Sequence, residues 1–170
     1  YGNAQNRLLI NNGVGKFIDK TGWLLPRMID QSTHADWADF DLDGDEDLLI
    51  VNGHVYPEAS SDSIDSERAQ PMLWMSRTGD RFEKATIQGE TTLRTYRDRA
   101  AVFGDLDGDG DTDVVVAQRN GPVRILRNDA TGRKPLVIQL QGHAMGAAMH
   151  ITLDDGSVVS RWKHSGGGFQ

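Results

Sequence analysis

Two short acidic segments hold the residues of this sequence whose types and spacing could do chemistry. Residues 39–47 read DFDLDGDED and carry six acidic side chains, and residues 105–113 read DLDGDGDTD and carry five. Both follow the pattern D-x-D-x-D-G-x-x-D, so that Asp39 corresponds to Asp105, 66 residues later. Carboxylates held this close together repel one another, which favours a bound cation at their centre.

The spacing of these aspartates suits a hard divalent cation. Positions 1, 3, 5 and 9 would supply carboxylates, position 7 would supply its backbone carbonyl, and glycine at position 6 allows the sharp turn. Oxygen ligands in this number favour Ca²⁺ at two sites over Mg²⁺, and the lack of His or Cys in both segments disfavours zinc. We expect the position-7 side chains, Asp45 and Asp111, to be solvated. The candidate metal ligands are Asp39, Asp41, Asp43, Asp45, Asp47, Asp105, Asp107, Asp109, Asp111 and Asp113.

The acidic segments are compatible with two other interpretations. An EF-hand loop begins in the same way, but it needs a bidentate Glu at position 12 and a helix on each side. Position 12 is Ile50 in one copy and Val116 in the other, each inside a predicted strand, so the sequence excludes an EF-hand. A solvated acidic turn without an ion is the remaining alternative, and the second copy in register makes it the less favoured one.

The elements that must position these loops are predicted to be short strands. DLLIV (47–51) and DVVVA (113–117) are apolar and rich in branched residues, as fully buried strands are. A second element, LLINNGVGKF (8–17), recurs as LWMSRTGDRF (73–82) and more faintly as ILRNDATGRK (125–134). Self-similarity at such spacing predicts an all-β repeat architecture, a partial β-propeller of about two blades. We expect the four tryptophans to fill its core: Trp23, Trp37, Trp74 and Trp162.

Composition narrows the class of protein. The formal net charge of the 170 residues is −7, yet outside the two segments basic residues outnumber acidic ones, so the acidity belongs to the two loops. No basic field supports nucleic-acid binding, and no apolar run is long enough to span a membrane. The chain has no cysteine, which excludes disulfides and Cys-based zinc sites. It contains no G-x-S-x-G or H-E-x-x-H motif and no other catalytic constellation, so we expect no enzyme and assign no catalytic residue.

The acidic loops and the text around them resemble a known family. The loop D-x-D-x-D-G-x-x-D followed by a buried strand resembles the FG-GAP/VCBS repeat, the calcium-binding blade of integrin-α-like β-propellers. NRLLINNGVGKF, RAAVFGDLDGDGDTDVVV and VRILRND resemble the FG-GAP proteins that carry a C-terminal ASPIC/UnbV domain. That group includes cartilage acidic protein and the UnbV-type proteins of bacterial enediyne gene clusters.

The same resemblance divides the chain. It implies propeller blades over residues 1–132 and the start of a small ASPIC/UnbV β-domain over 133–170, with a strand after the last blade and a GGGF segment. Ala148 stands where that domain usually carries an arginine, so no role is transferred to this position. Because the chain lacks an initiator Met and closed propellers need about four to eight blades, we expect the rest of the propeller in a longer protein.

The resemblance also sets the expected function. It implies a calcium-binding, non-catalytic propeller that recognises a protein or a glycan, outside the cell or in the periplasm. The location follows from the family and from the millimolar calcium there, which fills weak sites. The alternative is an accessory protein or enzyme of enediyne-type polyketide biosynthesis, for which the sequence shows no catalytic residues.

Overall fold

The computed structural model describes residues 6–24, 32–53, 72–77, 81–88, 98–130, 132–141 and 145–163. Short strands dominate these residues, and the only helix among them is a single turn, α1. The elements in chain order are β1 (Leu9–Asn11), β2 (Phe17–Asp19), α1 (Thr21–Leu24), β3 (Ser32–Ala38), β4 (Asp47–Asn52), β5 (Met72–Arg77), β6 (Arg81–Ala85), β7 (Asp98–Gly104), β8 (Asp113–Gln118), β9 (Arg124–Leu126), β10 (Ala148–Thr152) and β11 (Val158–Trp162).

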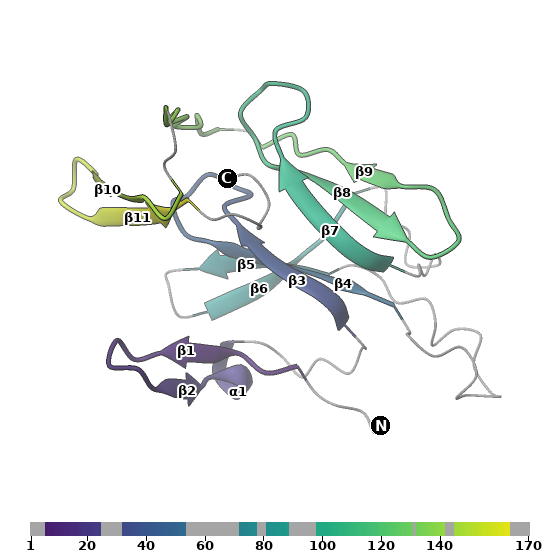
Figure 1. The fold of residues 1–170 in the computed structure, drawn as a ribbon, viewed down its shortest axis with the longest axis horizontal. Helices are drawn as coiled ribbons and strands as arrows, with labels where there is room; N and C mark the ends of the chain where they lie inside the picture. Colours follow the sequence, from purple (N-terminus) through teal and green to yellow (C-terminus); the bar gives the residue numbers. More distant parts are fainter. Residues whose placement is uncertain are drawn as a thin grey trace.

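The strands form four small antiparallel sheets (Figure 1). The largest sheet has the order β3-β4-β5-β6, the next has the order β7-β8-β9, and β1-β2 and β10-β11 are two-stranded. Neighbouring strands in each sheet are consecutive in the sequence and antiparallel, which makes each sheet a meander. The all-β prediction is confirmed for the described residues, whereas the number of blades stays a prediction.

The sequence repeat is also a structural repeat. Each strand of the pair β3-β4 lies 66 residues before its counterpart in the pair β7-β8, and the acidic segment connects the two strands in both copies. Both pairs even carry an irregularity at the same place, between Ser32 and His34 and between Asp98 and Ala100. The repeated unit therefore places each acidic loop at the same end of a buried strand.

The main core lies between the two larger sheets. Val51 on β4 and Val116 on β8 are fully buried and belong to one apolar cluster. Phe40 of the first loop meets Phe103 of β7 edge to face, with ring centroids 5.4 Å apart. The Thr33 hydroxyl donates to the Asp98 carbonyl at 3.0 Å and links β3 to β7. The first acidic loop is thus anchored in the core by its second residue.

The opposite face of β4 is covered as well. Leu48 and Ile50 form a smaller cluster with Trp37 and Phe82, whose rings lie 5.8 Å apart. Burial on both faces explains why β4 is apolar at consecutive positions rather than at alternate ones. The expectation that the tryptophans fill the core holds in part for Trp37, which is partly buried here.

The expectation for Trp162 is wrong. Its side chain is 55% exposed, because it lies on the two-stranded β10-β11 sheet and no second layer among the described residues covers it. The side chains of Trp23 and Trp74 lie outside the described residues.

The segment after the second sheet differs from the strand that the family resemblance implies. Residues 132–141 form neither helix nor strand, and Leu136 and Val137 are largely exposed. A strand needs a neighbour for its backbone groups, and Pro135 has no N–H to offer one. The next strand is β10, which begins at Ala148. The boundary between residues 132 and 133 stays a prediction, and the GGGF segment lies outside the described residues.

Candidate metal centres

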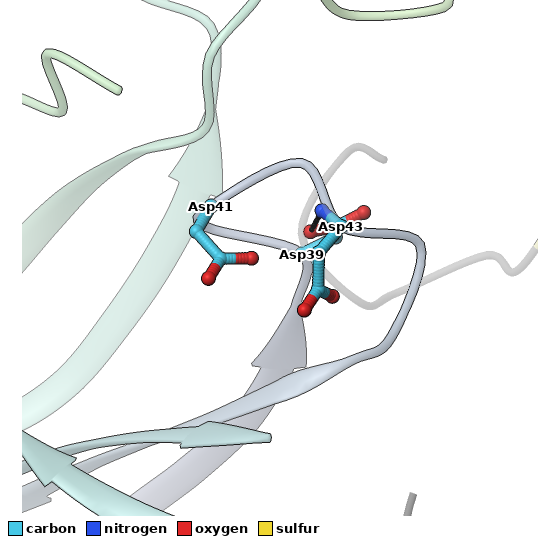
Figure 2. Close-up of side chains that lie close together, drawn as sticks. All are labelled: Asp39, Asp41 and Asp43. Carbon is cyan, nitrogen blue, oxygen red and sulfur yellow. Dashed lines mark hydrogen bonds between the residues drawn. The ribbon is translucent and has the colours of Figure 1, made fainter. Parts of the chain in front are cut away.

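The loop between β3 and β4 brings three of its aspartates together. Carboxylate oxygens of Asp39, Asp41 and Asp43 all lie within 4.8 Å of one another (Figure 2). The side chains of Asp41 and Asp43 are 30% and 19% exposed, so solvent reaches both carboxylates only in part. Three carboxylates at this separation form a compact set of oxygen donors.

Hydrogen bonds within the loop build this conformation. The N–H groups of Asp43 and Gly44 donate to the two carboxylate oxygens of Asp39, at 2.9 and 2.8 Å. The N–H of Asp45 donates to Asp43 Oδ1 at 2.9 Å. Leu42 and Gly44 have φ values of 58° and 94°, in the left-handed region. The φ of Leu42 lies within the narrow left-handed range that other residues can adopt, whereas that of Gly44 lies beyond it, so the turn favours glycine at position 6.

The second loop repeats the arrangement. Oxygens of Asp105, Asp107 and Asp109 also lie within 4.8 Å of one another. The N–H of Gly110 donates to Asp105 Oδ2 at 3.0 Å and that of Asp111 to Asp109 Oδ1 at 2.9 Å, which are the equivalents of two bonds in the first loop. The three carboxylates of this copy are exposed, whereas those of the first copy are partly covered.

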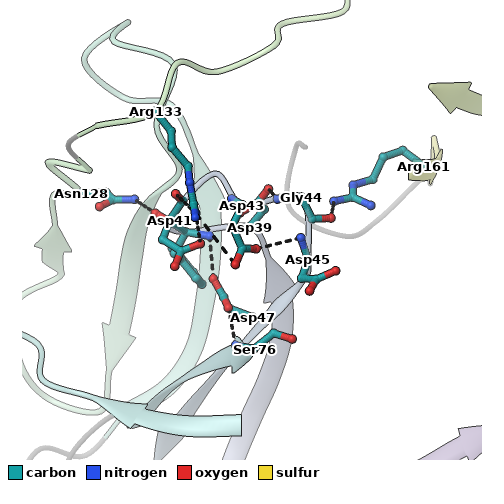
Figure 3. A network of polar contacts seen from close by, with 11 residues as sticks. Asp39, Asp41, Asp43, Gly44, Asp45, Asp47, Ser76, Asn128, Arg133 and Arg161 are labelled. Atoms are coloured by element: carbon teal, nitrogen blue, oxygen red, sulfur yellow. Dashed lines mark hydrogen bonds and ion pairs between the residues drawn. The ribbon is translucent and has the colours of Figure 1, made fainter. Parts of the chain in front are cut away.

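The aspartates at position 9 lie apart from these groups of three and hold the backbone instead. The N–H of Phe40 donates to Asp47 Oδ2 at 2.9 Å, and the N–H of Ser76 on β5 donates to its Oδ1 at 2.6 Å (Figure 3). Asp113 accepts the equivalent pair, from the second residue of its loop at 2.9 Å and from Asn128 at 2.8 Å. Both side chains are fully buried. Asp47 ties its loop to β5, the third strand of its sheet, and Asp113 ties its loop to the chain just after β9.

The position-7 aspartates are not alike. Asp45 is exposed, as expected, but the prediction of a solvated side chain is wrong for Asp111, which is 6% exposed. The chain that follows β9 covers it, and the backbone N–H of Ala130 donates to its carboxylate. The first loop has no equivalent cover on this side chain among the described residues.

Four aspartates of the two loops have pKa values above the ordinary value of a carboxyl group. Burial raises the pKa of Asp47 to about 6 and also raises that of Asp39, although backbone N–H donors oppose the shift at both. Loss of water raises the pKa of Asp107 and of Asp111, and the charge of Asp109 acts in the same direction. A nearby cation favours ionised carboxylates and would reverse these shifts.

Three side chains outside the acidic segments make polar contacts with the first loop. Asn128 donates its side-chain amide to the Phe40 carbonyl at 2.7 Å, Arg133 contacts Asp41, and Arg161 on β11 donates to the Gly44 carbonyl at 3.2 Å (Figure 3). Sequence reasoning missed all three. Asn128 could have been found as the counterpart of Ser76 on β5, and Arg133 as the counterpart of Arg81, in the faint third copy of the repeated element. Arg161 lies outside the repeated elements and carries no such signal.

The donor set fits a hard cation. Every candidate side chain offers oxygen, and Ca²⁺ takes six to eight oxygens at roughly 2.3–2.6 Å. Among the described residues, the two loops are the places where three metal-ligating side chains gather. Three carboxylates supply part of such a shell in each loop, and backbone carbonyls and water are the usual remaining ligands.

Comparison with known families agrees with the repeat. The model of the FG-GAP-like repeat matches residues 1–50 and 105–156, which is more than half of the 170 residues. The two matched stretches contain both acidic loops. No curated protein and no solved structure matches the chain. The chain belongs to the FG-GAP-like repeat family.

Proposed function

We propose that this chain is a non-catalytic β-propeller module that binds Ca²⁺ at its two acidic loops. One observation carries the proposal: three carboxylates lie within 4.8 Å of one another at the same positions of two structural repeats. Membership of the FG-GAP-like repeat family supports it. Desolvation raises the pKa of Asp39 and of Asp107, and the charges of neighbouring aspartates add to both shifts; a bound cation would offset that repulsion.

In each loop the aspartates at positions 1, 3 and 5 would hold the ion, together with the position-7 carbonyl. Asp47 and Asp113 stay candidate ligands, and their present bonds already join each loop to the core of its sheet. Ca²⁺ would supply the positive charge that offsets repulsion among the carboxylates. The loop residues would then fix the turn between two buried strands, so the ion's role in this proposal is structural.

Thermal unfolding with excess Ca²⁺ and with EDTA tests the calcium proposal. A ligand that binds only the folded state adds about 2.7 kcal/mol per site at 100 times its Kd. For a chain of this size, that corresponds to a rise in Tm of about 5–11 °C per site. We expect Asp43→Asn with Asp109→Asn to abolish the rise, and Asp129→Asn, in an exposed ion pair outside the loops, to keep it. A Tm that chelation leaves unchanged overturns the proposal.

The wider role that we propose is recognition of a protein or glycan outside the cell or in the periplasm. Family membership supports a propeller module, and extracellular modules bind Ca²⁺ with Kd values of about 10⁻⁴–10⁻³ M, which suits exposed loops such as 105–113. Among the described residues, no helix is long and apolar enough to cross a membrane. Labelling of intact cells with an impermeant reagent tests the location, and labelling only after lysis would contradict it.

We also propose that residues 133–170 begin an ASPIC/UnbV domain and that further blades complete the propeller. The β10-β11 hairpin supports a separate β-unit, because its strands pair with each other and join neither larger sheet. An experimental structure of a longer stretch of the protein tests this. Strands after residue 133 that add to the propeller sheets would contradict it.

A further inference from the structure

The guanidinium of Arg133 contacts the carboxylates of the first acidic loop. Nη1 of Arg133 donates to the Asp41 carbonyl at 3.0 Å and to Asp41 Oδ1 at 3.2 Å, and it lies 3.9 Å from Asp43 Oδ2 (Figure 3). One guanidinium therefore contacts two of the three carboxylates that the first metal site would use.

The second loop lacks an equivalent contact. Within the described residues, the hydrogen bonds and ion pairs join no arginine or lysine to Asp105, Asp107 or Asp109. Arg127 forms its ion pair with Asp129, at 2.8 Å. Asp129 is the main cause of the raised pKa of Arg127, and the charges of Asp107 and Asp109 add to it. Arg133 belongs to the faint third copy of the repeated element, at the position of Arg81, whose side chain lies outside the described residues.

The segment that carries Arg133 is placed by the second loop. The ring of Pro135 lies against Gly110, so closely that a side chain at Gly110 would overlap it. Gly110 needs its left-handed φ of 91° for the turn of the second loop. Residues 133–135 therefore touch both loops, with Pro135 on the second and Arg133 on the first.

We propose that Arg133 is a built-in competitor for the first metal site, so that the first loop binds Ca²⁺ more weakly than the second. This inference rests on the proposed calcium binding. An ion among the first-loop carboxylates needs oxygens of Asp41 and Asp43 that face Arg133, so the guanidinium must move away or remain as a repelling charge. By linkage, Ca²⁺ in the first loop loosens the hold of Arg133 on Asp41 by the same factor.

The expected effect is modest because Arg133 is exposed. Its side chain is 50% exposed, and ion pairs in such positions are weak and screened by solvent. Repulsion between a single and a double positive charge at short range in water adds to this. We expect the first loop to bind Ca²⁺ about three- to ten-fold more weakly than the second, and the difference to shrink as salt rises.

Calorimetric titration of the 170-residue chain with Ca²⁺ tests the proposal, with each loop measured alone. Asp107→Asn leaves the first loop intact, and Asp41→Asn leaves the second. In the first background, we expect Arg133→Gln to lower Kd about three- to ten-fold, while Arg133→Lys, which keeps the charge, lowers it less. In the second background, Arg133→Gln should change Kd less than about two-fold. Arg7→Gln, which removes a distant exposed cation, is the matched control and should leave both unchanged.

The outcomes separate this proposal from the calcium proposal. Equal affinities of the two loops, with no response to Arg133→Gln, would overturn competition while calcium binding stands. Weaker binding at the first loop after Arg133→Gln would overturn it as well, because Arg133 would then support the site. If neither background binds Ca²⁺ and circular dichroism shows both to be folded, both proposals fail.

Discussion

The ion pair between Asp98 and Arg124 predicts a large loss of stability on substitution. Asp98 begins β7 and is fully buried, and the side chain of Arg124, which begins β9, is 13% exposed. Nη2 of Arg124 donates to both carboxylate oxygens, at 2.9 and 2.7 Å. Asp98→Asn keeps the shape of the side chain but removes the negative charge that faces this nearly buried guanidinium.

The magnitude follows from burial. Removing one partner of a buried ion pair costs about 3–5 kcal/mol, because the remaining charge stays in a poor solvent. The chain offers a matched exposed pair, Arg7 and Asp19, in which Nε and Nη2 donate to one carboxylate oxygen at 3.0 and 2.6 Å. Exposed pairs contribute about 0–1 kcal/mol. With about 2–4 °C of Tm per kcal/mol at this size, Asp98→Asn should lower Tm by roughly 6–20 °C.

Thermal and urea unfolding in saturating Ca²⁺, followed by tryptophan fluorescence, measure the Tm and the free energy of unfolding of both variants with the acidic loops in one state. A double-mutant cycle with Arg124→Met isolates the pair, and we expect the double variant to be more stable than the sum of the single losses predicts. The reasoning is refuted if Asp98→Asn costs no more than the exposed control, Asp19→Asn.

Two smaller predictions concern a glycine and a carboxylate. Gly110→Ala should lower Tm more than Gly108→Ala, because both pay left-handed strain of about 1–2 kcal/mol but only the first meets the ring of Pro135; equal losses would contradict the packing of this ring on the loop. The N–H of Thr21 holds the pKa of Asp19 at about 2, below its ordinary 3.8. Its contribution to stability should therefore be present above pH 3.8 and disappear as pH falls towards 2; a midpoint at or above 3.8 in a carboxyl NMR titration would count against it.

The repeat made much of the fold predictable. Once Asp39 is set on Asp105, the apolar residues Ile50 and Val116 fall at the same position, and both lie on the buried strand that follows each loop. The pattern predicts a turn at Gly44, and the φ of 94° at this residue confirms it. These features are local, since each depends on residues within one loop and one strand.

The sequence does not distinguish the role of the aspartate at position 9 from that of the other loop aspartates. In the pattern, Asp47 is one more carboxylate beside Asp39, Asp41 and Asp43. Its distinct place depends on N–H groups of Phe40 and of a strand that begins 25 residues later, after a long connection. Such partners are set by tertiary packing, and the arginines that contact the first loop belong to the same class of long-range contact.

The two candidate sites are parts of one hydrogen-bonded layer. The buried carboxylate of Asp113 accepts from the N–H of Asn128, whose side chain donates to the Phe40 carbonyl, and the N–H of Phe40 donates to the buried carboxylate of Asp47. This path joins position 9 of one loop to position 9 of the other through two residues, Asn128 and Phe40. Each step is short, from 2.7 to 2.9 Å, and two of its members are fully buried. The two loops are therefore linked through their position-9 carboxylates, whereas the turn of each loop is held by hydrogen bonds within that loop.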